Sequence, residues 1–479
     1  MLNKNFNGRR WKKTEATKID KLPDFVTFDK RGEPKIIGSL LAKHVRENLF
    51  YKIVRNNGRS DQQIYVYSGG VYKPCSAELF KGYIKKFVSD IDEEYVKMSG
   101  INEAYKQLTT DLEYVSIEEL DADESIINFS NGILKISDGQ LNLLPHSPEY
   151  LSTIQIPCDW TDKKVSTPVF DNYIKTLTSG DKDVENLLLE FMGAVISNVK
   201  GYRMKKSLFM VGTGDTGKSQ LKSLCEKLIG PENYSGCELS DLEERFGTSD
   251  LYCKRLIGSA DASGMKVKEF KAFKKLTGGD TIRAEFKGLK AFNFTYNGLM
   301  WLCMNNLPKF GGDNGPWVYE RIMVVSCNNV IPKAKQDKTL LEKMFAERKG
   351  IIQKSVKALT KVIANGYRFD EPKSVIEMRE KYMNDNNTVV TFFRECMCER
   401  GEKQPFDNCT TGKIFRAYKA WCRNNYPGFC ETERDFRKEI SKIIGGEYKE
   451  IITRRNGSSY FKNFTLTLEA KQNYCITAA

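Results

Sequence analysis

The order of apolar and polar residues divides the chain into stretches with different periodicities. Between Met1 and about Leu120, short β-like pieces such as QIYVYSGGVYK alternate with helical runs such as AELFKGYIKKFVSDIDEEYVKM. The SGG in the first piece has the composition of a hairpin turn. Residues 1–120 are therefore predicted to form an N-terminal α+β domain.

Residues 121–200 have a mixed pattern that leads into the next stretch. INFSNGILKI and QLNLLPHSPEY come first, and FDNYIKTL and VENLLLEFMGAVISN follow with helical spacing. We expect this segment to end in a helical bridge to the residues that follow it.

Residues 201–335 alternate between strand-like and helical runs. The strand-like runs are SLFMV, RLIGSA, FNFTY, LMWLCM and RIMVVS, and VKEFKAFKKL is helical. Such alternation predicts an α/β core.

Residues 336–400 have the pattern of a helical connector, and residues 401–479 that of a separate domain. The last domain contains two amphipathic helices, TGKIFRAYKAWCRNNY and TERDFRKEISKII, and then two strands, YKEIITRR and SYFKNFTLTL, joined by NGS. Two helices followed by a two-stranded wing predict a winged helix, in which one helix enters the major groove of DNA.

Composition adds an expected class of partner to this picture of several folded domains. The 479 residues are 40% hydrophobic and 29% charged, and 75 basic against 62 acidic residues give a net charge of +13. That excess favours an anionic partner such as nucleic acid. The 13 cysteines are scattered without zinc-site spacing, and no apolar run reaches membrane-spanning length. We expect free thiols, a cytoplasmic location and no membrane contact.

The segment GTGDTGKS follows the strand-like run SLFMV and precedes a helix. Its glycines, lysine and serine match G-x4-G-K-[ST], a loop whose backbone N–H groups surround phosphate oxygens. Lys218 is expected to neutralise the β and γ phosphates of ATP, and Ser219 to hold Mg²⁺. The expected nucleotide contacts are Gly212, Thr213, Gly214, Asp215, Thr216, Gly217, Lys218, Ser219 and Gln220.

Three residues after the loop are candidates for catalysis. Asp261 ends the strand-like run RLIGSA and is expected to share the metal with Ser219; an Asp that opens a turn is the alternative. Asn305 ends LMWLCM, where an amide would polarise the attacking water, or would simply form a turn. Arg321 opens RIMVVS, and is either an arginine finger acting on a neighbouring subunit or a surface ion-pair partner.

A hairpin is predicted between Asp261 and Asn305, because TIRAEF and KAFNFTY flank the tip KGL. Lys287 and Lys290 would then project from the core at the tip. Solvated tip lysines are the ordinary alternative to lysines that hold phosphates.

This ordered set resembles the superfamily 3 helicases of the AAA+ class: phosphate loop, acid-ended strand, KKLTGGDTIRAEF, a strand ending in N-x-L-P, and a late Arg. It is most similar to the phage and plasmid primase-helicase C-terminal family, which is related to the poxvirus primase-helicase. INFSNGILKI with PHSPEY and TGKIFRAYKAWCRNN extend the resemblance over about 125–469. With this length and no evident primase domain, the chain looks most like the replication initiators of staphylococcal pathogenicity islands.

The resemblance implies an α/β fold with an AAA+ P-loop ATPase core at 201–335, and 121–200 as the segment that precedes it in the family. It implies that Lys218 is the Walker A lysine, Asp261 the Walker B acid, Asn305 sensor 1 and Arg321 the arginine finger. It also implies a homo-hexamer that pulls single-stranded DNA through a central channel with the 281–296 hairpin. The family usually has Glu where this chain has Asp261, and a carboxylate set back by one methylene slows turnover by up to about a hundredfold.

The winged helix adds an expected contact with an origin in double-stranded DNA. Its candidate DNA contacts are Arg434, Arg437, Lys438, Lys442, Arg454, Arg455 and Lys462. Because Glu433, Asp435 and Glu439 are interleaved with these residues, an ordinary charged helix face competes with this interpretation.

Other functions remain open from the sequence. The acid pair Asp90 and Asp92 resembles a primase metal site, although its surroundings have helical spacing. A DNA-binding regulator that uses ATP only to assemble is a second alternative. An ATP-driven packaging or remodelling motor is a third, and a winged helix gives it no support.

Overall fold

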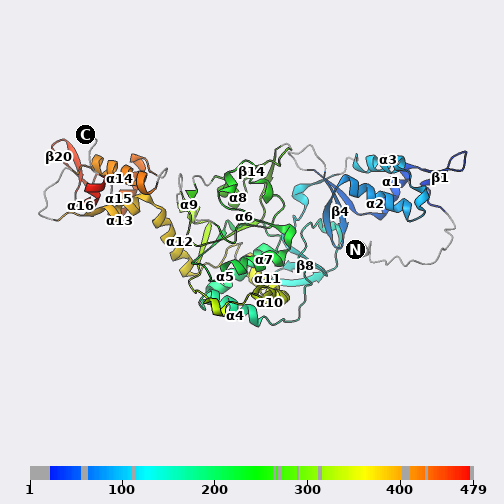
Figure 1. Ribbon diagram of the computed structural model, residues 1–479, viewed down its shortest axis with the longest axis horizontal. Coiled ribbons are helices and arrows are strands. Elements are labelled where there is room, and N and C mark those ends of the chain that lie inside the picture. Colours follow the sequence, from blue (N-terminus) through cyan, green and yellow to red (C-terminus); the bar gives the residue numbers. More distant parts are fainter. Residues whose placement is uncertain are drawn as a thin grey trace.

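The computed structural model describes residues 22–55, 63–110, 114–262, 266–267, 271–288, 291–310, 316–401, 409–426 and 430–474. These residues form an elongated molecule with three bodies in a row (Figure 1). The N-terminal body is blue, the central body runs from cyan to yellow, and the C-terminal body is orange to red. No helix in the described ranges is both long and apolar enough to cross a bilayer.

The N-terminal body packs helices on a four-stranded sheet with the order β5-β4-β3-β6. The predicted SGG turn is confirmed, since Ser68 pairs with Val71 and both glycines between them have positive φ. The elements are β1 (Val26–Phe28), β2 (Pro34–Ile36), α1 (Gly38–Asn48), β3 (Tyr51–Arg55), β4 (Gln63–Ser68), β5 (Val71–Cys75), α2 (Ala77–Ser89), α3 (Met98–Thr109) and β6 (Val115–Ser116).

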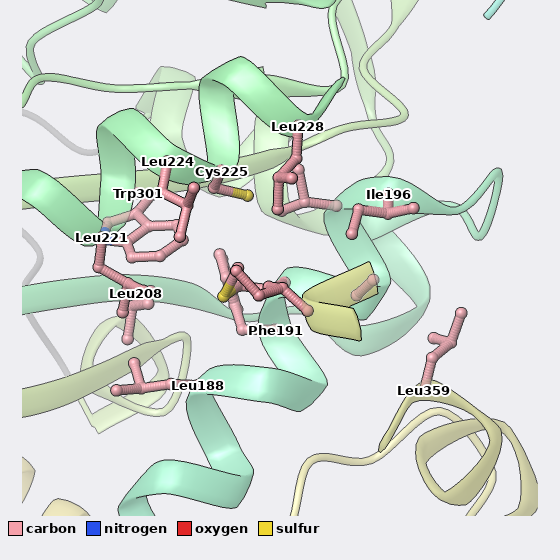
Figure 2. Packing of buried hydrophobic residues seen from close by; sticks show 14 of the residues in the cluster. Leu188, Phe191, Ile196, Leu208, Leu221, Leu224, Cys225, Leu228, Trp301 and Leu359 are labelled. Carbon is pink, nitrogen blue, oxygen red and sulfur yellow. The ribbon is translucent and has the colours of Figure 1, made fainter. Parts of the chain in front are cut away.

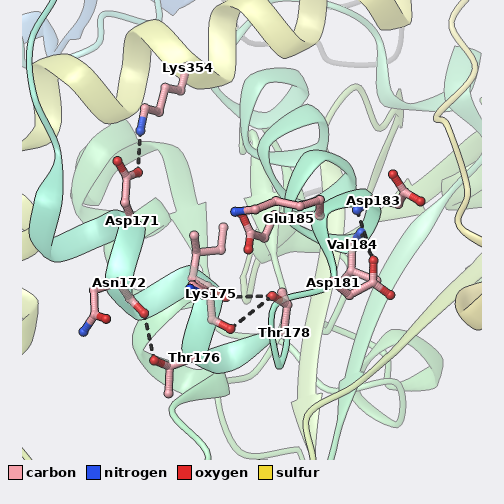
Figure 3. Close-up of polar contacts among 12 residues, drawn as sticks. Asp171, Asn172, Lys175, Thr176, Thr178, Asp181, Asp183, Val184, Glu185 and Lys354 are labelled. Carbon is pink, nitrogen blue, oxygen red and sulfur yellow. Dashed lines mark hydrogen bonds and ion pairs between the residues drawn. The ribbon is translucent and has the colours of Figure 1, made fainter.

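A three-stranded antiparallel sheet and two helices connect this body to the centre. The strands are β7 (Ile126–Phe129), β8 (Gly132–Ser137) and β9 (Gln140–Leu144), and the helices are α4 (Pro168–Leu177) and α5 (Lys182–Ile196). The Asp181 side chain accepts hydrogen bonds from the backbone N–H groups of Asp183 and Val184, which starts α5 directly after the α4 turn (Figure 3).

The central body is built on a five-stranded parallel sheet with the order β11-β12-β16-β10-β18. All six residues of β16 are buried, as expected for a strand covered on both faces. The sheet strands are β10 (Ser207–Val211), β11 (Tyr234–Ser235), β12 (Leu256–Ile257), β16 (Leu299–Met304) and β18 (Ile322–Ser326). Around it lie α6 (Gly201–Met204), α7 (Lys218–Ile229), β13 (Lys266–Val267), α8 (Lys271–Gly278), β14 (Thr281–Ala284), β15 (Phe292–Thr295), β17 (Lys309–Phe310) and α9 (Pro316–Tyr319).

Helices that come before, between and after the sheet strands in the sequence cover one face of the sheet. Leu221, Leu224 and Leu228 of α7 pack with Phe191 of α5 and with Trp301 of β16 (Figure 2). α10 (Leu340–Ala346) and α11 (Arg348–Ala364) contribute to the same cluster. These two helices fall in the expected connector, yet they pack as part of the central body.

The α5–α11 contact is unusually close. A Cβ atom at Gly193 of α5 would lie 2.2 Å from the main-chain oxygen of Ser355 in α11. Only glycine permits this approach of the two backbones.

The C-terminal body begins before residue 401. Val389 and Phe392 of α13 (Thr388–Cys396) are buried in its core, whereas α12 (Lys373–Asn386) packs along β18. The remaining elements are β19 (Met397–Glu399), α14 (Thr411–Asn425), α15 (Glu433–Ile444), β20 (Ile452–Arg455), β21 (Ser458–Phe461), β22 (Phe464–Leu466) and α16 (Leu468–Tyr474). The packing therefore changes from one body to the next between α12 and α13.

The predicted two-helix and hairpin order of this body is present, with one difference. β20 and β21 pair around Asn456 and Gly457, which both have positive φ as a two-residue hairpin turn requires. The expected strand SYFKNFTLTL is instead two strands. β22 leaves the hairpin after Lys462 and Asn463 and pairs with β19. The hairpin is thus shorter than predicted, and β22 connects it to β19, the strand that directly follows α13.

Candidate functional site

The loop 212–217 lies at the carboxyl end of β10, between that strand and the N-terminus of α7. The backbone N–H of Gly212 donates to the carbonyl of Met304 (3.2 Å), and that of Cys327 donates to Val211 (2.7 Å). Both neighbouring strands therefore hold the start of the loop. A Cβ atom at Gly212 would lie 1.9 Å from the oxygen of Cys327, so the motif glycine is required by this close approach.

Two further features give the loop the form that the sequence predicted for binding phosphate. Gly217 has φ +89°, which turns the chain into α7, and Asp215 is also left-handed with φ +62°. The N-terminus of a helix presents unpaired N–H groups and the positive end of its dipole. A loop of this form at the start of the 12-residue α7 fits the triphosphate expected from the sequence.

Lys218 connects the loop to Asn305 on the adjacent strand. Its Nζ donates to the carbonyls of Gly212 (2.9 Å) and Thr213 (3.0 Å) and to Oδ1 of Asn305 (3.0 Å). The lysine is 6% exposed, so its ammonium is held inside the loop. The sheet order explains the contact, because β16 lies beside β10 and delivers Asn305 to the same edge.

Ser219 connects the loop to Asp261. Its Oγ donates to the carbonyl of Ala260 at 2.7 Å, one residue before Asp261, which is exposed. The structure therefore brings together four sequence-predicted residues, Lys218, Ser219, Asp261 and Asn305, at the carboxyl edge of the sheet. This edge is where ligands bind in open α/β sheets.

The strand that carries Asp261 contains a bulge. Ile257 is opposite Met300 and Ala262 is opposite Met304, so five steps along one strand match four along the other. The extra residue lies between Ser259 and Ala262, because the carbonyl of Ser259 accepts from the backbone N–H of Cys303 and the carbonyl of Cys303 accepts from that of Ala262. Gly258, with φ +135°, precedes the bulge, and a Cβ atom there would lie 1.9 Å from the oxygen of Trp301.

Two buried thiols lie at the base of the loop without adding charge. Burial raises the pKa of Cys303 to about 12 and that of Cys327 to about 12. Both side chains therefore stay protonated at neutral pH. The two thiols therefore do not offset the positive charge of Lys218 or the positive end of the α7 helix dipole.

Arg321 does not join this cluster. It precedes β18, at the amino edge of the parallel sheet, and β10 separates that edge from the loop by five residues, about 16 Å. Its Nη1 donates to Thr277 Oγ1 (2.8 Å) and to the carbonyl of Lys274 (3.1 Å) at the end of α8. Within its own chain, Arg321 thus stabilises the C-terminus of α8 and does not reach the phosphate loop.

Sequence patterns missed one contact of the loop. The hydroxyl of Tyr173, on α4, donates to the carbonyl of Gly217 at 2.8 Å. Burial raises the pKa of Tyr173 well above its ordinary value, so the donor proton is retained. The only signal in the sequence is that Phe170, Tyr173, Ile174 and Leu177 form the buried face of α4.

Two family models match the chain. The D5 N terminal like family matches residues 3–179, and a family of unknown function (DUF5906) matches residues 210–321. The first match relates the N-terminal part of the chain to primase-helicase proteins. The second begins inside β10 and ends at Arg321, and so spans all the candidate catalytic residues. No curated protein matches the chain.

Solved structures of the apo NrS-1 C terminal region are similar to the chain at low identity. Three of them have 11%, 11% and 12% identity and TM-scores of 0.49, 0.45 and 0.46. Each alignment covers 89% of this chain and 98% of the other.

The predicted hairpin is confirmed as the antiparallel pair β14 and β15. Thr281 pairs with Thr295 and Ala284 with Phe292. Lys287 follows β14 and is exposed in the turn, whereas Lys290 lies outside the described residues. Lys287, the tip lysine among the described residues, therefore exposes its positive charge to solvent.

The predicted DNA contacts of the C-terminal body are all exposed, but their charges are not equally available. Glu433 forms an ion pair with Arg437, and Glu439 forms one with Lys442. Arg434 and Lys438, one helical turn apart on α15, form no ion pair with a described residue. They line an open depression of about 640 Å³ together with Lys449 and Tyr448. Arg454 and Arg455 end β20, and Lys462 follows β21.

The acid pair considered for a primase site is engaged locally. Asp90 forms an ion pair with Lys86, and Asp92 accepts a hydrogen bond from the backbone N–H of Glu94. Both residues lie in the turn after α2.

Proposed function

We propose that this chain is an ATP-dependent DNA helicase that initiates replication of a mobile genetic element, such as a pathogenicity island. The family match over residues 3–179 supports a role in replication of the primase-helicase kind. The observation that carries the helicase proposal is the meeting of Lys218 with Asn305 and of Ser219 with the Asp261 segment at one edge of the sheet.

Each residue of this cluster has a role that follows from its position. The backbone N–H groups of the loop and of the first turn of α7 bind phosphate oxygens, and Lys218 leaves its carbonyl partners to neutralise them. Ser219 and Asp261 would hold Mg²⁺, which neutralises charge developing on the transferring phosphoryl group. Asn305 orients the attacking water through its amide.

A complete site requires a second subunit. Arg321 lies at the amino edge of its own sheet, so it stabilises charge only on a nucleotide held by a neighbour. Head-to-tail contacts that place each Arg321 at the next loop close into a ring. The superfamily 3 resemblance sets the expected size of the ring at six.

The ring would place the β14–β15 hairpins around a central channel. Lys287 and Lys290 would hold phosphates of one DNA strand, and movement of the hairpins with nucleotide state would pull that strand. The complementary strand is then excluded and the duplex opens. The C-terminal body, as a winged helix, would anchor the ring at an origin through α15 and the β20–β21 hairpin.

An assay of strand displacement tests this function. We expect ATP hydrolysis stimulated by single-stranded DNA, and displacement of a labelled strand, both lost in Lys218→Ala. Lys287→Ala should lose displacement and DNA stimulation. Sequence-specific DNA binding that requires ATP but opens no duplex would overturn the proposal and identify an ATP-assembled regulator instead.

A further inference from the structure

A groove of about 730 Å³ lies on the N-terminal body, away from the phosphate loop and from the β14–β15 hairpin. It runs between the end of α1, the start of β3 and the segment Pro148–Leu151 that follows β9. None of the residues assigned above to nucleotide or DNA binding lines it. The side chains that give it chemical character are Phe50, Tyr114, Arg46 and Lys52.

Two exposed aromatic rings lie on this groove. Among the described residues, four aromatic side chains are exposed, namely Phe28, Phe50, Tyr114 and Phe246, with exposed fractions of 49%, 48%, 52% and 39%. Two of the four, Phe50 and Tyr114, line the same groove. A pair of exposed rings on one concave surface marks a binding site more strongly than single rings elsewhere.

Both rings are held by neighbours. Phe50 makes an edge-to-face contact with Tyr67, with ring centroids 6.3 Å apart. The guanidinium of Arg55 lies 4.5 Å from the centroid of Tyr114. Rings fixed in this way lose little conformational entropy when a flat ligand stacks on them.

The charges of the groove favour an anionic ligand. Arg46 and Lys52 line it, Arg55 stands beside Tyr114, and Glu149 is the one acidic side chain among the described lining residues. Nη2 of Arg46 donates to the carbonyl of Gln107 at 3.4 Å, which holds the guanidinium at the rim. Flat rings combined with cations are the chemistry that binds single-stranded nucleic acid, in which bases stack and phosphates pair with Lys and Arg.

We propose that this groove is a second site for single-stranded DNA, with bases stacked on Phe50 and Tyr114 and phosphates held by Arg46 and Lys52. The site is separate from the channel hairpin and needs no nucleotide. It would hold a strand on the N-terminal body while the central body moves along it.

Anisotropy of a fluorescein-labelled oligothymidylate, measured on the full chain without ATP, tests the site. The double variant Phe50→Ala/Tyr114→Ala should bind at least tenfold more weakly, because stacking on each ring contributes several-fold. Phe28→Ala is the matched control, since its ring is equally exposed and makes an edge-to-face contact with Tyr95. It should bind within twofold of the wild type, and Phe50→Trp should keep its affinity.

Salt dependence separates the two kinds of contact. Arg46→Ala and Lys52→Ala should each make the slope of log affinity against log salt shallower by about 0.7, whereas the aromatic variants leave the slope unchanged. Photocrosslinking of an oligonucleotide containing 5-bromodeoxyuridine should label the segments around Phe50 and Tyr114.

One result would overturn the second site, and it does not depend on helicase action: a double aromatic variant that binds the oligonucleotide as the wild type does. If that variant also changes the sedimentation of the protein, the groove is a contact between copies of the chain. Lys218→Ala should leave crosslinking at the groove intact, so failure of the ATPase proposal is distinguishable.

Discussion

The hydroxyl of Tyr173 donates a hydrogen bond to the main-chain oxygen of Gly217, the residue that turns the phosphate loop into α7. Tyr173 comes from α4, whose own N-terminus is fixed to α11. The carboxylate of Glu347 accepts from the backbone N–H groups of Val169 and Phe170, and Lys354 forms an ion pair with Asp171 (Figure 3). α4, fixed to α11 in this way, thus holds the loop through the phenol group of Tyr173.

Tyr173→Phe removes only this hydroxyl and keeps the ring. A buried hydrogen bond contributes about 0.5–1.5 kcal/mol, so we expect the KM for ATP to rise about two- to tenfold with kcat nearly unchanged. Steady-state phosphate release measures both constants. Tyr296→Phe is the matched control, because its buried hydroxyl donates to the carbonyl of Leu299 (3.0 Å), away from the loop. An equal rise in KM in both variants would mean a general loss of packing.

Asp261→Asn removes the carboxylate proposed to share the metal with Ser219. Metal-held charge stabilises the transition state by several kcal/mol, so turnover at saturating Mg²⁺ should fall at least about a hundredfold. Asp261→Glu, which restores the residue usual in the resembling family, should hydrolyse ATP at least as fast as the wild type. Wild-type turnover in the Asn variant would place the metal on another residue.

Subunits with different lesions should restore each other's activity. Lys218→Ala and Arg321→Ala are each expected to lose ATP hydrolysis, but a mixture forms some interfaces with an intact loop from one copy and an intact Arg321 from the other. Mixing the two proteins should therefore recover a measurable fraction of wild-type phosphate release. If both proteins assemble and their mixture is as inactive as each alone, Arg321 does not act on a neighbouring subunit, and its role is its contact with α8.

Arg255 should be a stability determinant of the central body. It is 3% exposed and donates to the carbonyls of Ala194, Val199 and Asn297 at 2.7–2.9 Å, joining the end of α5 to the start of β16. Burial lowers its pKa to about 10, which still leaves the guanidinium charged at neutral pH. Arg255→Met removes three hydrogen bonds of a charged group and leaves the buried carbonyl of Val199 without this donor, so it should lower the free energy of unfolding by about 3 kcal/mol or more in urea titration. Arg245→Met, at an exposed ion pair with Glu285, is the control and should change it little.

The C-terminal body should bind duplex DNA chiefly through Arg434 and Lys438. The double alanine variant should weaken binding and make the slope of log affinity against log salt shallower by about 1.8, the value for two phosphate contacts. Lys357→Ala/Lys361→Ala on α11 removes the same charge elsewhere and should leave the slope unchanged. If neither double variant changes the slope, α15 is not part of the DNA interface.

Local chemistry made some of these features predictable from the sequence. The Gly-rich loop, the Asn456–Gly457 turn and the β14–β15 pair all depend on residues near one another in the chain. The meeting of Lys218 with Asn305 was expected both from the place of Asn305 at the end of an apolar strand-like run and from the resemblance. It results from β16 lying between β12 and β10, which no local pattern specifies.

Features that depend on distant packing were not predictable. Tyr173 is an ordinary buried aromatic residue on an amphipathic helix until α4 is placed beside the loop. The bulge between Ser259 and Ala262 shifts the alternation of side chains, so the direction of Asp261 could not be counted from Leu256. The pairing of β22 with β19 joins residues more than 60 positions apart, across the boundary expected between the connector and the last domain.

The missing side chain at Gly193 has a mechanical consequence. At Gly193 the two helices touch backbone to backbone, so any side chain at this position would collide with the main chain of Ser355 and force α5 and α11 apart. Gly193 therefore sets the spacing of the two helices.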